Sequence, residues 1–188
     1  MARVFADTNV LFPFSIMDLL VALSEDGIHQ VIWTDALLDE WEDVIVREQK
    51  RSLQAAAAIT SAIRDFFEDS KVERDEYEHL IDEMPGTDDD DHEHMAAAVA
   101  RQPCTILTKN TRDFPSKPLR ERGVRVLDPD TYLCELADEL PDEVADTLIR
   151  LAGEKRRPPK SPEGLLADLE RAGVSRFAAA VRLLLTAG

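Results

Sequence analysis

The chain has 188 residues, of which 44% are hydrophobic and 32% charged, so it can build a packed core and is not globally disordered. Its formal net charge of −16 excludes a broadly basic nucleic-acid-binding coat, but not a nucleic-acid enzyme with metal cations in an acidic pocket. Two cysteines exclude a disulfide scaffold, and an early acid at Asp7 with no long apolar run predicts a cytoplasmic protein without signal peptide or membrane contact.

Short apolar runs alternate with amphipathic segments along most of the chain. The runs predict strands over 4–6, 31–33, 104–108 and 124–127. The amphipathic segments predict helices over 16–24 with Ser15 as cap, from 35 with Thr34 as cap, and over 53–67, 74–83, about 90–100, 130–139, 142–152, 161–172 and 174–186. This alternation predicts an α/β fold of three layers, α/β/α, with a mostly parallel central sheet.

Charge and proline divide the chain into four predicted regions. Residues 1–130 form the main domain, 131–152 a helical extension, 153–162 a linker rich in proline and charge, and 163–188 a small helical tail. The linker cations, Lys155 and Lys160 among them, either steer a nucleic acid electrostatically or only solubilise an exposed connection.

Polar side chains gather where the predicted strands end. Asp7 closes the first strand ahead of Thr8 and Asn9, and a buried acid there needs a hydrogen bond, an ion pair or a cation. The third strand ends with Thr108, and Lys109, Asn110, Arg112 and Asp113 follow it. The alternative is that these residues only cap turns and helices, with Lys109 and Arg112 as surface charges rather than phosphate ligands.

Two helical segments add further acids. Glu40 flanks the apolar stripe that contains Leu37 and Trp41, and the acidic run 88–91 ends with Asp91 on the first turn of a buried helix face. His92 and His94 also suggest zinc, but residues two apart on a helix point to different sides. A site with carboxylate oxygens and no thiols favours Mg²⁺ or Mn²⁺ over zinc. Enzymes that hydrolyse phosphodiesters use such ions to activate a water.

Four segments resemble the PIN domain family in order and spacing: 4–11, 37–41, 90–98 and 106–115. The length with a helical extension resembles the VapC-type toxins of type II toxin–antitoxin modules. The resemblance implies a PIN-like fold and a ribonuclease dependent on Mg²⁺ or Mn²⁺, with RNA as substrate and a cognate antitoxin and a second copy of the chain as partners. The antitoxin is expected to reach the acidic groove with a cationic segment.

The same resemblance implies roles for individual residues. Asp7, Glu40, Asp91 and Asp113 would be catalytic, with Asp7, Asp91 and Asp113 as metal ligands. Supporting residues would be Thr8, Asn9, Asp90, Thr108 and Asn110. Asp90 competes with Asp91 for the third position, and Asn110 with Asp113 for the fourth.

Two other functions fit some of these residues. A haloacid-dehalogenase-like phosphatase also begins with an acid after strand one, but its second acid would stand where Asn9 is, and its lysine precedes the late acids. A non-catalytic module that binds RNA or a partner would need no complete set of acids.

Overall fold

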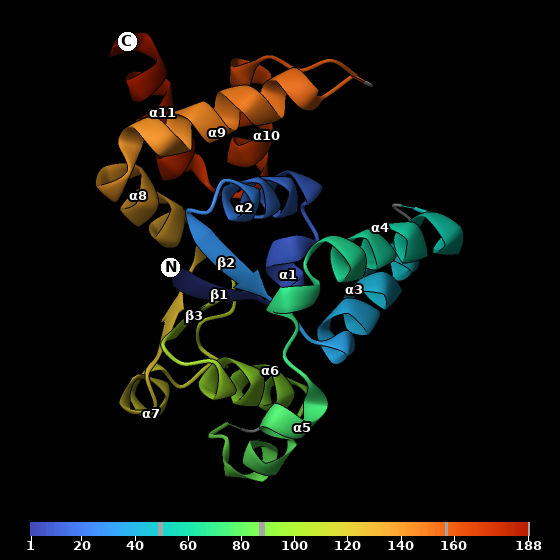
Figure 1. Ribbon diagram of the computed structural model, residues 1–188. Helices are drawn as coiled ribbons and strands as arrows, with labels where there is room; N and C mark the ends of the chain where they lie inside the picture. Colours follow the sequence, from blue (N-terminus) through green and yellow to red (C-terminus); the bar gives the residue numbers. More distant parts are fainter. Residues whose placement is uncertain (49–50, 87–88, 157, 188) are drawn as a thin grey trace.

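The structure is a computed structural model that describes residues 1–48, 51–86, 89–156 and 158–187, without the side chains of residues 89, 90 and 187. Its described strands form one fully parallel sheet in the order β2-β1-β3-β4 (Figure 1). The strands are β1 (Ala2–Ala6), β2 (His29–Ile32), β3 (Cys104–Leu107) and β4 (Val124–Leu127). The predicted α/β fold with a parallel sheet is therefore confirmed.

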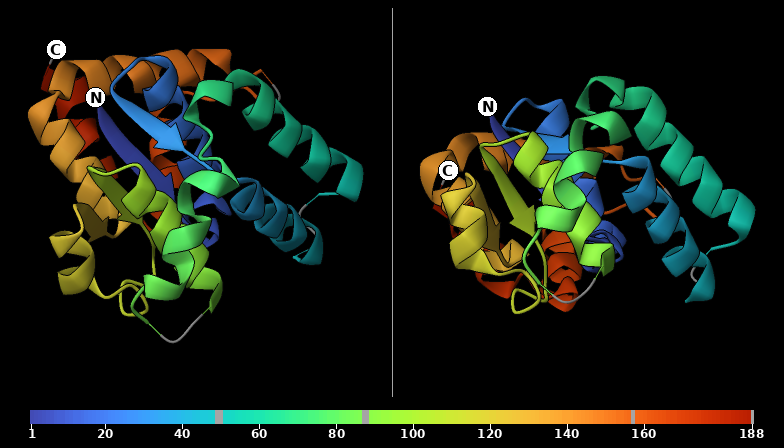
Figure 2. Two further views of the ribbon diagram at one scale, coloured as in Figure 1. Left: turned by 60° about the horizontal axis from the view of Figure 1, so that its bottom comes forward. Right: turned by 90° about the horizontal axis from the view of Figure 1, so that it is seen from below.

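Helices cover both faces of the sheet. They are α1 (Thr8–Leu11), α2 (Phe14–Glu25), α3 (Asp35–Arg47), α4 (Leu53–Phe66), α5 (Arg74–Tyr77), α6 (Asp89–Ala100), α7 (Ser116–Glu121), α8 (Pro129–Glu139), α9 (Pro141–Glu154), α10 (Pro162–Ala172) and α11 (Ser175–Ala187). Helix α6 packs on β1 and β3, and α2 packs on β2 and also contacts α9 and α10 (Figure 1). The α3–α4 pair extends to one side of the sheet (Figure 2). No helix among the described residues is long and apolar enough to cross a membrane.

Local sequence explains most helix boundaries. Thr34 caps α3 as predicted, since its hydroxyl accepts a hydrogen bond from the Leu37 amide at 3.0 Å. The prediction of Ser15 as a cap is wrong: α2 begins at Phe14, after Pro13, whose φ of −69° already suits a helix start. The helix predicted over 74–83 is α-helical only to Tyr77 and continues as a 3₁₀ helix over Glu78–Glu83.

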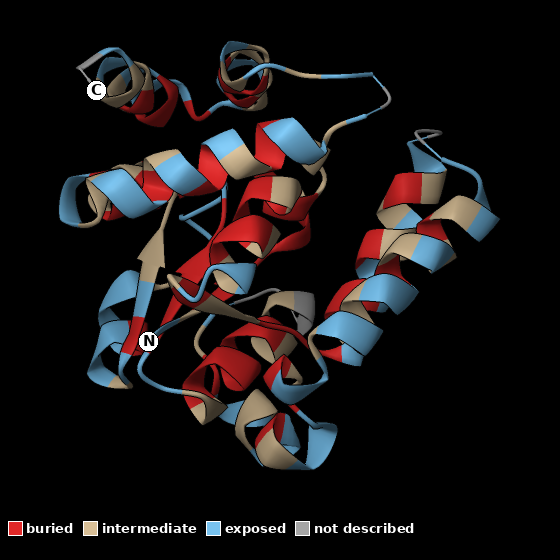
Figure 3. Cartoon of the chain, turned by 45° about the horizontal axis from the view of Figure 1, so that its top comes forward, coloured by how far each residue is buried: buried red, intermediate tan, exposed pale blue. Residues whose placement is uncertain are grey.

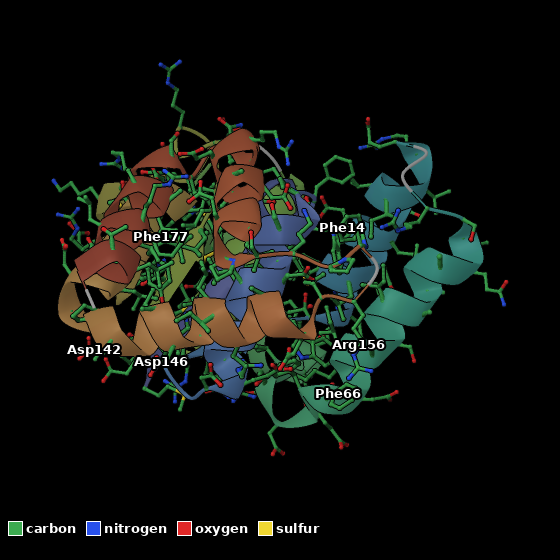
Figure 4. All side chains as sticks on the ribbon, turned by 90° about the horizontal axis from the view of Figure 1, so that it is seen from above. Phe14, Phe66, Asp142, Asp146, Arg156 and Phe177 are labelled. Carbon is green, nitrogen blue, oxygen red and sulfur yellow. The ribbon has the colours of Figure 1, made fainter. Side chains whose placement is uncertain are left out.

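The C-terminal helices share the core of the rest of the chain. Buried faces of the helices turn toward the sheet and toward one another, while exposed faces turn outward (Figure 3). Leu166 of α10 and Phe177 and Val181 of α11 are fully buried in the same cluster as the sheet residues. In the view of Figure 4, Phe177 lies among the C-terminal helices, whereas Phe66 lies at the edge of α4. The limits of the four predicted regions stay a prediction.

Ion pairs bind the segment between α9 and α10 to its neighbours. Lys155 pairs with Asp18 of α2, and Lys160 pairs with Asp168 of α10. Asp130 of α8 holds the start of α11 in place. Its carboxylate accepts hydrogen bonds from the Phe177 amide at 2.9 Å and the Arg176 side chain at 3.0 Å. These contacts favour a structural role for the two lysines over free electrostatic steering.

His29 gives stability a specific pH dependence. It is fully buried, its Nε2 donates to the Leu20 carbonyl at 2.9 Å, and its Nδ1 therefore accepts from the Tyr132 hydroxyl at 2.9 Å. Burial lowers the pKa of His29 to about 4, so between pH 6.5 and 4 the unfolded chain binds a proton that the folded one does not. Stability should thus fall by about 2 kcal/mol from pH 7 to pH 5 through this residue.

Urea unfolding at both pH values tests this expectation. The loss should be about 2 kcal/mol smaller in His29→Gln than in the wild type. His79→Gln is the matched control, because His79 is exposed and should leave the pH dependence unchanged. Equal losses in the wild type and His29→Gln would contradict the assignment.

Candidate active site

Asp7 is the centre of a hydrogen-bond network at the carboxyl edge of the sheet. It follows β1, and its residue is only 6% exposed. Its Oδ2 accepts hydrogen bonds from the Thr108 hydroxyl at 2.7 Å and from the Asn9 amide. Thr108 follows the neighbouring strand β3, so parallel pairing of β1 with β3 brings the two residues together.

Thr8 connects Asp7 to the acid of α3. The Thr8 hydroxyl lies 2.8 Å from Glu40 Oε1 and 3.3 Å from Asp7 Oδ1. A hydroxyl has one hydrogen to donate, and the shorter distance assigns it to Glu40. Thr8 thus donates to Glu40 and lies next to Asp7, so the carboxylate of Glu40 reaches the carboxyl edge of the sheet although its side chain is 43% exposed.

His94 holds Glu40 from the other side. Its Nε2 lies 3.3 Å from Glu40 Oε2, and its ring lies 5.3 Å from the ring of Phe5 in β1. Burial alone would raise the pKa of Glu40, but hydrogen bonds from His94 and Thr8 hold it below its usual value. Burial likewise opposes protonation of His94, yet Glu40, with the charges of Asp7 and Asp91, raises the pKa of His94. Each group therefore favours the charged form of the other.

Sequence reasoning considered His94 only as a zinc ligand and missed its role beside Glu40. The available signal was its position three residues after Asp91, which places both on one face of α6. Asp91 is partly buried, and its charge reaches His94. The side chain of Asp90, the alternative to Asp91, lies outside the described residues.

The fourth segment joins the network through Asn110. The Asn110 backbone amide donates to the Thr108 hydroxyl at 3.0 Å, and its side-chain amide donates to the exposed carboxylate of Asp113. Asn110 thus contacts the hydroxyl that binds Asp7, whereas Asp113 is connected to Asp7 through Asn110. Arg112 is exposed on the same loop.

A pocket of about 390 Å³ opens beside Thr8, Asn9 and Glu40. Two cations, Arg47 and Lys109, also line it. The charge of Arg47 contributes to the lowered pKa of Glu40. Arg47 was missed by sequence reasoning, although it stands two helical turns after Glu40 on α3. Acidic groups flanked by cations suit a polyanion whose charge is partly balanced by metal.

The carboxylate oxygens near Asp7 suit a hard cation such as Mg²⁺, although the described side chains form no complete metal-binding cluster. Within the described side chains, no three histidines, cysteines or acids are arranged as a metal site. Mg²⁺ usually keeps several waters and binds through one or two carboxylates plus substrate phosphates, so it needs no such cluster. Asp7, with Glu40 and Asp91 around His94, offers oxygen ligands of this kind. The full ligand set Asp7, Asp91 and Asp113 stays a prediction.

Comparison with known proteins identifies the family of the chain. The profile of the PIN domain matches residues 3–112, which carry Asp7, Glu40, Asp91 and Asn110. The chain belongs to the PIN domain family. Beyond this PIN domain, residues 129–183 match the VapC50 C-terminal domain, which corresponds to α8–α11. The resemblance inferred from the four segments is thus confirmed.

One curated relative of this PIN domain protein comes from Mycobacterium tuberculosis (strain ATCC 25618 / H37Rv) and is named "Putative ribonuclease VapC50". The two are 30% identical over 112 residues, which is 60% of this chain and 65% of the relative. The chain thus matches just under two thirds of the relative's length. No solved structure matches the chain.

Proposed function

We propose that the protein is an endoribonuclease that depends on Mg²⁺ or Mn²⁺ and acts in the cytoplasm as the toxin of a toxin–antitoxin pair. The observation that carries the proposal is the network in which the buried Asp7 and His94 and the partly exposed Glu40 come together at one edge of a PIN-type sheet. The name of the mycobacterial relative supports RNA as the substrate.

Each side chain has a proposed task in hydrolysis. Asp7, Asp91 and Asp113 would hold the metal, which when bound neutralises a phosphate oxygen and acidifies a water. Thr8, Asn9, Thr108 and Asn110 orient the carboxylates through the hydrogen bonds described above. His94 keeps Glu40 ionised, so that Glu40 can accept a proton from the attacking water. That water forms a bond to phosphorus as the ribose oxygen on the other side leaves and takes up a proton.

An acidic site also suits the proposed protein partner. A cationic antitoxin segment, with an arginine that reaches the carboxylates, would compete directly with metal and RNA. Such charge pairing weakens as salt rises. A second copy of the chain remains a further expected partner.

Incubation of purified protein with total RNA, with mapping of the cut sites, tests the function. Cleavage is expected with Mg²⁺ or Mn²⁺ and should stop with excess EDTA. RNA binding without cleavage at any metal concentration would instead support the non-catalytic module. Hydrolysis of a generic phosphate monoester in place of RNA would point to a phosphatase.

A further inference from the structure

Lys109 links the active-site loop to the C-terminal helices. It follows Thr108 at the end of β3, and its Nζ donates a hydrogen bond to the carbonyl of Ala172 at 3.0 Å, 63 positions later. Ala172 is the last residue of α10, within the part that matches the VapC50 C-terminal domain. The C-terminal extension therefore reaches the edge of the proposed RNA site.

The end of α10 is suited to hold an ammonium group. The last carbonyls of a helix lack partners within it, and they form its negative end. Gly173 has a φ of +101°, which turns the chain back on the helix. The Gly173 amide donates to the Glu170 carbonyl, and the Val174 amide donates to the Leu169 carbonyl. The carbonyl of Ala172, at the end of the helix, accepts its hydrogen bond from Lys109.

The other end of Lys109 is fixed in the active site. Its backbone amide donates to Asn9 Oδ1 at 2.9 Å, and Asn9 in turn donates to Asp7. The side chain lines the same pocket as Thr8 and Glu40. An ammonium group has three donors, of which Ala172 occupies one, so two remain for a phosphate. Partial desolvation of the side chain lowers the pKa of Lys109.

The extension is itself held rigidly. Asp130 of α8 binds Arg176 and Phe177 in the first turn of α11, which begins two residues after Gly173. Phe177 and Leu166 anchor α11 and α10 in the core. The carbonyl of Ala172 thus lies between two helices that are packed in the common core, and it presents a defined acceptor to Lys109.

We propose that the C-terminal extension is a working part of the RNA site, in which the end of α10 positions the Lys109 ammonium to bind a backbone phosphate of the RNA substrate. The proposal rests on the proposed ribonuclease function. It assigns Lys109 to substrate binding and the α10 terminus to positioning Lys109.

Lys109→Met and Lys109→Arg test the binding role. With labelled single-stranded RNA in Mg²⁺, Lys109→Met should raise KM roughly tenfold and lower kcat less. RNA binding by Lys109→Met, measured in Ca²⁺, should depend less steeply on salt: the slope of log K against the logarithm of salt concentration should be smaller by about 0.7. Lys109→Arg should restore most of both values. A lysine that only caps α10 would instead lower the melting temperature and leave KM and the salt slope unchanged.

Gly173→Val tests whether the end of α10 positions Lys109. Valine is strained at a φ of +101°, so it should displace the carbonyl of Ala172. KM should rise in Gly173→Val, and Gly173→Val with Lys109→Met should be no worse than Lys109→Met alone. Gly153→Val is the control, because Gly153 lies in α9 with open space around its Cα. Assays run well below each variant's unfolding temperature.

The outcomes separate the two proposals. If the wild type cleaves RNA but Lys109→Met leaves KM unchanged, or if the two substitutions raise KM independently, the positioning role is wrong and the ribonuclease stands. If the wild type neither cleaves nor binds RNA, the proposed function falls, and the role of Lys109 falls with it.

Discussion

Asp7→Asn is expected to lower metal-dependent RNA cleavage by about a thousandfold, because it removes the charge at the centre of the network. Asparagine has nearly the same volume as aspartate and can still accept the hydrogen bond from Thr108 at the same edge of the sheet. The fold should therefore persist, and the loss should appear in the chemical step. Initial rates on a labelled RNA in Mg²⁺, with circular dichroism on the same samples, measure both effects.

Asp39→Asn is the matched control for Asp7→Asn. Asp39 precedes Glu40 on α3, but its side chain is 72% exposed and pairs with Arg64 on α4. The same change of charge there should alter cleavage less than twofold, since exposed ion pairs contribute little. Cleavage by Asp7→Asn at a rate similar to that of Asp39→Asn would remove Asp7 from the active site.

Phe177→Ala should be the most destabilising of the proposed substitutions, at about 3–5 kcal/mol. Phe177 is fully buried where α11 packs on α8, so alanine leaves a cavity between the C-terminal extension and the rest of the core. For a chain of this length the melting temperature should fall by about 6–20 °C. Urea unfolding monitored by circular dichroism gives the free energy directly.

Phe66→Ala provides the same substitution at an exposed site. Phe66 is 82% exposed at the end of α4, as Figure 4 illustrates, and its truncation should change stability by less than about 0.5 kcal/mol. If Phe177→Ala were as mild as Phe66→Ala, the extension would not share the core of the PIN domain. A loss of RNA affinity in Phe177→Ala at low temperature would further agree with the link through Lys109.

The charge of the protein is compatible with its proposed substrate because of how the site is arranged. The net charge of −16 is unfavourable for RNA over most of the surface. At the pocket, however, Arg47 and Lys109 flank Glu40. These two cations make the site locally less anionic than its surroundings.

The sequence by itself determined the strands, the longer helices and the edge of the sheet where Asp7 and Thr108 meet, but it did not indicate the short helices α1 and α7. Buried strands are short apolar runs and helices repeat their apolar residues every three to four positions, so local order identifies both. The carboxyl ends of parallel strands share one edge, so residues that follow β1 and β3 must come together. This reasoning needs no knowledge of which helix packs where.

Only the tertiary structure decided which side chains pair across the site. Glu40 with His94, Lys109 with Ala172 and Asp130 with Phe177 each join segments whose separation in the chain carries no periodic signal. Such pairs depend on the position and rotation of helices packed against the sheet, to within the few tenths of an ångström that a hydrogen bond tolerates. The pattern of apolar residues fixes which face of a helix is buried, but not which polar side chain at its border meets a partner.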